Sequence, residues 1–194
     1  MAAADPDSLP GIFRDVVRVL EHDQIPYLII GGVAQAVIGE PRMTQDVDCI
    51  VAVQTDQIAG LLNSLAAEGF EADPKIIRER VDSTGTFSVQ RGRWHVDVIL
   101  ASTEFEQSAF KRAQRIRLYD LDVNLPTPED LILLKLVPGR DKDLLDVRTV
   151  MMRHRQQLDV SYLEQWAQRL SDASEDSRIW ETLQRLLNET SASA

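Results

Sequence analysis

Apolar residues in the first half of the chain alternate between helical spacing and short uninterrupted runs. Between Leu9 and His22 they recur three or four positions apart, which predicts an amphipathic helix. Residues 27–30 form a short apolar run that predicts a buried strand, and Gly31-Gly32 ends it. The pattern then predicts, in order, a helix over 33–38, a strand over 47–53, a helix capped by Thr55 and stopped at Gly69, and a hairpin of strands 86–90 and 94–100.

The pattern becomes mainly helical after two further short strands, at 116–118 and 123–125. A helix start is predicted at Thr127-Pro128, where a hydroxyl cap precedes a proline and two acidic residues. Helices are expected over 129–137, 141–153, 161–170 and 177–188. This order predicts an α+β protein with an α/β-type core: a small mixed β-sheet flanked by helices over residues 1–126, followed by a C-terminal helical part over 127–194.

Charge and composition narrow the functional classes. The 194 residues are 44% hydrophobic and carry a net charge of −10, which argues against a protein that coats nucleic acid through a large basic face. Arg78, Arg80, Arg91 and Arg93 leave room for one local basic groove. Cys49 is the only cysteine and lies in an apolar run, so we expect a buried residue. With no apolar run long enough for a bilayer and no signal-peptide pattern, we expect a cytoplasmic protein without a membrane partner.

The residues most informative about chemistry surround the first predicted strand. Gly31-Gly32 allows a tight turn into a helix, and the N–H groups at that helix start predict a phosphate-binding seat. Asp46 and Asp48 lie two apart on the next strand, so both carboxylates point to one side while Val47 points into the core. Paired carboxylates facing a phosphate seat suit Mg²⁺.

Asp97 is the third acidic residue of interest, in the apolar strand Val96-Asp97-Val98. A buried carboxylate needs a partner, and a cation shared with the aspartate pair would provide one. Asp97 is also suited to accept the proton of an attacking hydroxyl. Each feature alone has a structural explanation, such as a simple turn, a strand edge or an arginine partner for Asp97. Their occurrence together and in this order favours a functional site.

The combination Ile30-Gly31-Gly32, Asp46-Val47-Asp48-Cys49 and Val96-Asp97-Val98 resembles the signature of the nucleotidyltransferase superfamily. The resemblance implies the nucleotidyltransferase fold, a divalent metal (Mg²⁺ or Mn²⁺) held by Asp46, Asp48 and Asp97, and a nucleoside triphosphate such as ATP as substrate. Gly31 and Gly32 would bind its phosphates, and Arg42 and Thr44 would assist. Arg42 could instead hold Asp46, and Thr44 could be a cap.

The segments Thr127–Leu136 and Gly139–Val147 are similar to an element of AbiEii/MenA-type nucleotidyltransferase toxins of bacteria. This narrower resemblance implies that Lys135 reaches the triphosphate and that Asp143 or Asp146 supports it. Lysine on a mostly apolar helix fits an anion partner, although an exposed lysine and an ion-pair network at the start of the next helix are open alternatives.

We therefore expect metal-dependent transfer of a nucleoside monophosphate to an acceptor hydroxyl. The acceptor is open among an RNA end such as that of tRNA, a protein and a small molecule, and the chain could be the toxin of a toxin–antitoxin pair. The alternative is a catalytically inactive binding module, with a cognate antitoxin as a candidate partner. An apolar stripe in the C-terminal helices could form a dimer surface or pack internally: Trp166, Leu170, Ile179, Trp180, Leu183 and Leu187.

Overall fold

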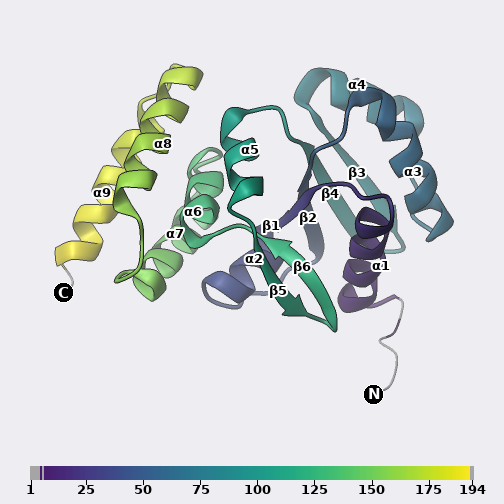
Figure 1. Cartoon of the computed structure of the whole chain (residues 1–194), viewed down its shortest axis with the longest axis horizontal. Helices are drawn as coiled ribbons and strands as arrows, with labels where there is room; N and C mark the ends of the chain where they lie inside the picture. Colours follow the sequence, from purple (N-terminus) through teal and green to yellow (C-terminus); the bar gives the residue numbers. More distant parts are fainter. Residues whose placement is uncertain (1–4, 6, 193–194) are drawn as a thin grey trace. The chain divides into compact units, whose positions relative to one another are not determined.

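The computed structural model describes residue 5 and residues 7–192, which form two compact units. The first unit contains the described residues up to Val33 together with Met43–Leu125. The second contains Ala34–Arg42 and the chain from Pro126 onward. Helix α2 (Gly31–Ile38) begins in the first unit and continues in the second (Figure 1). The sequence predicted a single division between residues 126 and 127, whereas residues 34–42 belong with the C-terminal helices.

The first unit is built on a four-stranded mixed sheet. Its strands are β1 (Tyr27–Ile30), β2 (Asp46–Val51), β3 (Thr86–Arg91) and β4 (Trp94–Leu100), in the order β1-β2-β4-β3. The central pair β2 and β4 is parallel, and both outer pairs are antiparallel. A separate antiparallel ribbon of β5 (Gln114–Leu118) and β6 (Leu121–Leu125) contacts β1 through β6.

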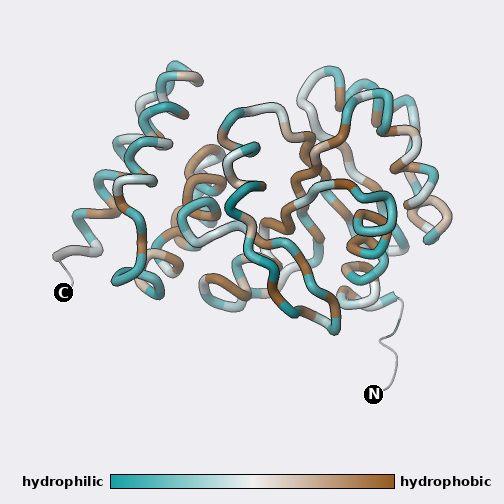
Figure 2. The backbone as a smooth tube through the Cα atoms, in the orientation of Figure 1, coloured by the Kyte–Doolittle hydropathy of each residue, from teal (hydrophilic) through white to brown (hydrophobic). Residues whose placement is uncertain are grey.

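One face of this sheet is apolar and packs against helix α1 (Leu9–His22). Phe87, Val89, Val96 and Val98 are buried on it, and the strands carry hydrophobic stretches in Figure 2. Arg91 shares this face and binds Asp15 of α1. The remaining helical elements of the unit are η1 (Thr55–Gln57), α3 (Ile58–Ala67), α4 (Pro74–Thr84) and α5 (Glu104–Lys111).

The described part of the second unit is helical. It comprises the C-terminal part of α2 and the helices α6 (Pro128–Leu136), α7 (Asp141–His154), α8 (Val160–Ser174) and α9 (Arg178–Ala192). Thr127 caps α6 as predicted, since its hydroxyl accepts the Asp130 N–H. Ile179 and Leu183 are buried and α8 contacts α9, so part of the predicted apolar stripe packs inside this unit.

The α+β architecture is confirmed, and several predicted boundaries differ from the structure by a few residues; three differences have a clear local reason or consequence. Helix α2 begins at Gly31 rather than at residue 33. Thr55 lies inside a short 3₁₀ helix preceded by Gln54, so it is not the cap of the following α-helix. Helix α4 was not predicted, because Ile77 is its only buried residue and no apolar stripe marks it. Among the described residues, every helix is too short or too polar to traverse a lipid bilayer.

Candidate functional site

Asp46, Asp48 and Asp97 project from the face of the sheet opposite the valine core. Strands β2 and β4 run parallel with Asp48 directly beside Asp97 and Asp46 beside His95. Val47 and Val96, which alternate with these residues, are fully buried. Because neighbouring residues in register share a face, the three carboxylates belong to one side of the sheet.

The turn between β1 and α2 lies directly against this acidic face. Gly31 has φ +59°, a left-handed conformation that favours glycine, and a Cβ there would lie 1.9 Å from Oδ2 of Asp48. A Cβ on Gly32 would lie 2.5 Å from Oγ1 of Thr44. Thr44 in turn exchanges hydrogen bonds with the backbone of Asp46, at 3.2 and 3.4 Å. The two glycines therefore bring the turn into contact with the acidic strand and the loop before it.

Asp97 is held from its other side by a residue that sequence reasoning missed. The Ser88 hydroxyl donates to Oδ1 of Asp97 over 2.5 Å, and the two residues are paired in the β3–β4 hairpin. The hairpin itself was predicted from the sequence. Extending its register outward from the Arg91–Trp94 pair would have identified Ser88 as the neighbour of Asp97.

Cys49, which follows Asp48, is buried and lies close enough to the acidic site to be affected by its negative charge. Burial raises the pKa of its thiol to about 12, and the negative charges of Asp48 and Asp97 contribute in the same direction. The thiol is thus protonated at neutral pH, and we assign it a packing role rather than a chemical one.

The carboxylates have the chemistry that suits a divalent cation, and Asp48 and Asp97 lie side by side on one face of the sheet. Among the described residues, no group of three His, Cys, Asp or Glu side chains is arranged to hold a metal ion. The carboxylate of Asp48 lies against Gly31 at the end of β1, and that of Asp97 accepts a hydrogen bond from Ser88 of β3. Adjacent strands are only about 4.8 Å apart, so two carboxylates in register on one face can reach a common cation. The residues present therefore fit Mg²⁺ or Mn²⁺.

The other predicted site residues form a buried ion-pair network within the second unit. Nζ of Lys135 lies 2.5 Å from Oδ2 of Asp146 and 4.0 Å from Oδ1 of Asp143. Nε of Arg42 contacts the same Asp146 oxygen at 3.3 Å, and Arg140 pairs with Asp143 at 2.5 Å. The Lys135 side chain is only 6% exposed, whereas that of Arg42 is 38% exposed. The alternative of an exposed Lys135 is therefore wrong, whereas Asp143 and Asp146 take part in ion pairs, the alternative that the sequence left open for the start of α7.

Gln35 is a further buried residue of this network that the sequence did not reveal. Its Nε2 donates to the Asp146 carbonyl at 3.3 Å and to the Thr149 hydroxyl at 2.8 Å. Gln35 is 1% exposed, and its position on α2 connects that helix to α7 within the second unit. No charge or motif marks a single glutamine, so only the fold identifies it.

Comparison of the sequence with known protein families identifies the family of this chain. Residues 7–192 match DUF6036, a nucleotidyltransferase family of unknown function. The chain belongs to this family. Membership makes the chain a nucleotidyltransferase and favours the enzyme over a non-catalytic binding module. The narrower resemblance to AbiEii/MenA-type toxins stays a prediction.

Several solved structures share the fold of this nucleotidyltransferase. The solution structure of the antibiotic-resistance factor ANT(2'')-Ia is 13% identical, with a TM-score of 0.52, and the match covers 95% of this chain and 93% of that one. JHP933 from Helicobacter pylori is 14% identical, with a TM-score of 0.50, over 94% and 91% of the two chains. The lincosamide antibiotic adenylyltransferase LnuA is 12% identical, with a TM-score of 0.50, over 72% and 94%. A comparison with curated protein sequences finds no match.

Replacing Gly31 of the nucleotidyltransferase by alanine tests the contact between the turn and Asp48. The left-handed backbone alone should lower the free energy of unfolding by about 1–2 kcal/mol. The added Cβ would also displace the Asp48 carboxylate, so we expect a larger loss of stability together with a loss of activity. Chemical denaturation and an activity assay measure the two effects.

Gly92→Ala is the matched control, because Gly92 has φ +58° and a Cβ there would meet no atom within 4 Å. It should show the backbone cost alone and retain activity. Equal destabilisation of the two variants, with equal activity, would show that the Asp48 carboxylate does not lie against Gly31.

Proposed function

We propose that this nucleotidyltransferase is metal-dependent and transfers a nucleoside monophosphate from a triphosphate such as ATP to an acceptor hydroxyl. In this proposal Asp46, Asp48 and Asp97 hold Mg²⁺ or Mn²⁺. One observation carries it: Asp48 and Asp97 lie in register on adjacent parallel strands, on the polar face, beside a glycine turn that opens a helix. A purely structural role would not favour two neighbouring carboxylates on one face, because they repel each other.

The residues of the first unit have distinct roles in the proposed reaction. The bound cation would neutralise triphosphate charge and polarise the α-phosphate. The N–H groups at the start of α2, near Gly31 and Gly32, are suited to phosphate oxygens. Thr44 fixes the backbone of Asp46 and thereby the start of β2. Ser88 acts as a positioning residue, because its hydrogen bond occupies one oxygen of Asp97 and leaves the other for the acceptor.

The reaction proposed is a displacement at the α-phosphorus. The acceptor oxygen forms a new bond to that phosphorus, and the bond from phosphorus to the oxygen bridging to the β-phosphate breaks. Pyrophosphate leaves with the electron pair, and the hydroxyl proton passes to the Asp97 carboxylate. The products are a phosphodiester of the acceptor and pyrophosphate.

In the second unit, we propose Arg42 rather than Lys135 as the phosphate-contacting cation. Arg42 is the more exposed of the two, and it forms its ion pair with Asp146 through Nε. A guanidinium held at Nε retains its terminal N–H groups for a bidentate phosphate contact. Asp146 then acts as a positioning residue that holds Arg42, and Lys135, which also contacts Asp143, holds Asp146 in place.

The acceptor classes that remain in the proposal are small molecules, proteins and RNA ends such as that of tRNA. Two fold relatives are described with antibiotics: ANT(2'')-Ia in complex with adenylyl-2''-tobramycin, and LnuA bound to lincomycin. These relatives make a small-molecule acceptor a reasonable first choice. A toxin role with a cognate antitoxin would accompany an RNA or protein acceptor.

The experiment is a label-transfer assay with each nucleoside triphosphate labelled at the α-phosphate. The enzyme is incubated with Mg²⁺ or Mn²⁺ and with total RNA, cell protein or small-molecule extract. We expect transfer that stops on chelation of the metal and in Asp97→Asn, while Asp82→Asn, an exposed carboxylate on α4, serves as control. No transfer with any nucleotide, together with no nucleotide binding by calorimetry, would refute the proposal.

A further inference from the structure

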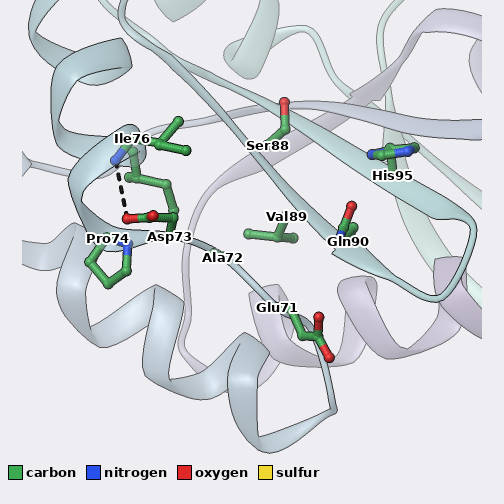
Figure 3. A pocket seen from close by; sticks show the side chains of 10 residues that line it. Glu71, Ala72, Asp73, Pro74, Ile76, Ser88, Val89, Gln90 and His95 are labelled. Atoms are coloured by element: carbon green, nitrogen blue, oxygen red, sulfur yellow. Dashed lines mark hydrogen bonds between the residues drawn. The ribbon is translucent and has the colours of Figure 1, made fainter.

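A groove of about 630 Å³ lies beside the acidic site within the first unit. Its floor is formed by Ser88 and Gln90 of β3 and His95 of β4, and its far wall by the start of α4 and the segment before it (Figure 3). Ser88 and Gln90 alternate with the buried Phe87 and Val89, so the floor belongs to the same sheet face as Asp97.

The groove is connected to the proposed reacting group by a hydrogen bond. Ser88 lines the groove and donates its hydroxyl to Oδ1 of Asp97 over 2.5 Å. Ser88 therefore lies between the groove and Asp97. This places the groove where an acceptor hydroxyl would need to be.

The lining of the groove is acidic. It includes Glu71 and Asp73, and none of the described lining residues is lysine or arginine. Both carboxylates are attached to fixed backbone: Glu71 exchanges two backbone hydrogen bonds with Gln90, at 2.7 and 3.0 Å, and Asp73 caps α4 by accepting the N–H groups of Lys75 and Ile76. A pair of negative charges on an ordered backbone, above a floor of hydroxyl, amide and imidazole groups, is complementary to a ligand with amines and hydroxyls.

The basic residues that could have formed an RNA groove here are directed elsewhere. Arg91 lies on the opposite sheet face, where it binds Asp15 at 2.8 Å and stacks over Phe70 at 4.9 Å. Arg93 stacks on the ring of its neighbour Trp94 at 4.6 Å. Arg78 and Arg80 are two apart on α4 and so do not share a helix face. The local basic groove considered from the sequence is therefore not assembled, and this disfavours a phosphate-rich acceptor.

We propose that this groove binds the acceptor, and that the acceptor is a small molecule carrying both amines and hydroxyls. The inference rests on the proposed nucleotidyl transfer and adds the substrate class and its binding residues. Glu71 and Asp73 bind the amines, and the groove floor directs one hydroxyl toward Asp97. Ile76 and Ile77 line the same wall and supply apolar contact for the ligand's carbon frame.

The test uses kanamycin, an oligosaccharide bearing amines, with raffinose as an uncharged control of similar size. The variant is Glu71→Gln/Asp73→Asn, which removes both charges while asparagine keeps its ability to cap α4. The matched control is Glu79→Gln/Asp82→Asn, which makes the same charge change at exposed positions of α4 outside the groove. Acceptor binding is measured by calorimetry without nucleotide, nucleotide binding is measured separately, and transfer is followed with labelled ATP.

We expect kanamycin to bind and accept label, and raffinose to do neither. In Glu71→Gln/Asp73→Asn the kanamycin KM should rise about tenfold, with kcat unchanged. Each exposed charge contact contributes up to about 1 kcal/mol, which corresponds to a few-fold change in affinity, and the variant removes two such contacts. The control variant should behave as the unmodified enzyme, and ATP binding should be the same in all three.

Two results would overturn the groove assignment while leaving the proposed transfer intact. One is kanamycin binding that the Glu71/Asp73 variant leaves unchanged. The other is efficient labelling of RNA in place of kanamycin, with the same efficiency in the variant. Loss of ATP binding in every protein, including the unmodified enzyme, would instead count against the proposed function itself.

Discussion

Asp48→Asn should reduce nucleotidyl transfer by about a thousandfold or more and leave the protein at least as stable as before. Asparagine keeps the size of the side chain against Gly31 but removes the charge proposed to hold the cation. The Lewis-acid contribution of a catalytic metal is several kcal/mol, which corresponds to a loss of this order. Stability should not fall, because Asp48 and Asp97 are neighbouring carboxylates whose repulsion the substitution relieves.

The measurement combines label transfer with urea denaturation of the same preparations. Asp82→Asn is the control, since it removes one carboxylate from an exposed position of α4 in the same unit. If Asp48→Asn lost stability but kept more than a tenth of the activity, the role of Asp48 would be structural and not catalytic.

Lys135→Met should lower the free energy of unfolding by about 3–5 kcal/mol, because it removes the buried cation beside two buried carboxylates and leaves them only the more exposed Arg42 and Arg140. Asp146 and Asp143 are 6% and 3% exposed, and Lys135 lies 2.5 Å from the nearer of them. Lys142→Met is the control, as Lys142 is exposed on the same helix as both aspartates.

The double variant Lys135→Met/Asp146→Leu separates a positioning role from a direct phosphate contact. Replacing both members of a buried ion pair by apolar residues is often close to neutral for stability, so most of the loss should be recovered. Arg42 would still lack its Asp146 partner, so the KM for the nucleotide should stay raised. If Lys135→Met proved fully stable and raised only the nucleotide KM, Lys135 would instead contact the triphosphate directly.

The sequence was sufficient for those parts of the fold that depend on local pattern. The alternation of Asp46, Val47 and Asp48 determined which side chains share a face, and the strand and its burial follow that pattern. Gly31-Gly32 predicted the turn because few other residues adopt its left-handed backbone. Helix α4 was missed because it buries only Ile77, although Asp73-Pro74 at its start and Gly85 at its end are cap signals that were present.

Contacts between residues distant in sequence could not be predicted from the pattern of hydrophobic and polar positions. Lys135 was correctly singled out as unusual on an apolar helix, but its partner could have been a phosphate or a carboxylate, and only the packing of α6 on α7 identifies Asp146. Gln35 carries no charge or motif, so its two hydrogen bonds to α7 had no sequence signal. The orientation of Arg91 away from the acidic face depends on Asp15, which lies 76 residues earlier.

The most direct test of the account is a crystal structure of the enzyme with Mn²⁺ and a non-hydrolysable triphosphate, using the anomalous signal of the metal. We predict a Mn²⁺ ion bound by oxygens of both Asp48 and Asp97 at about 2 Å, with the triphosphate completing its coordination. A bound triphosphate whose metal touches neither aspartate would contradict the account.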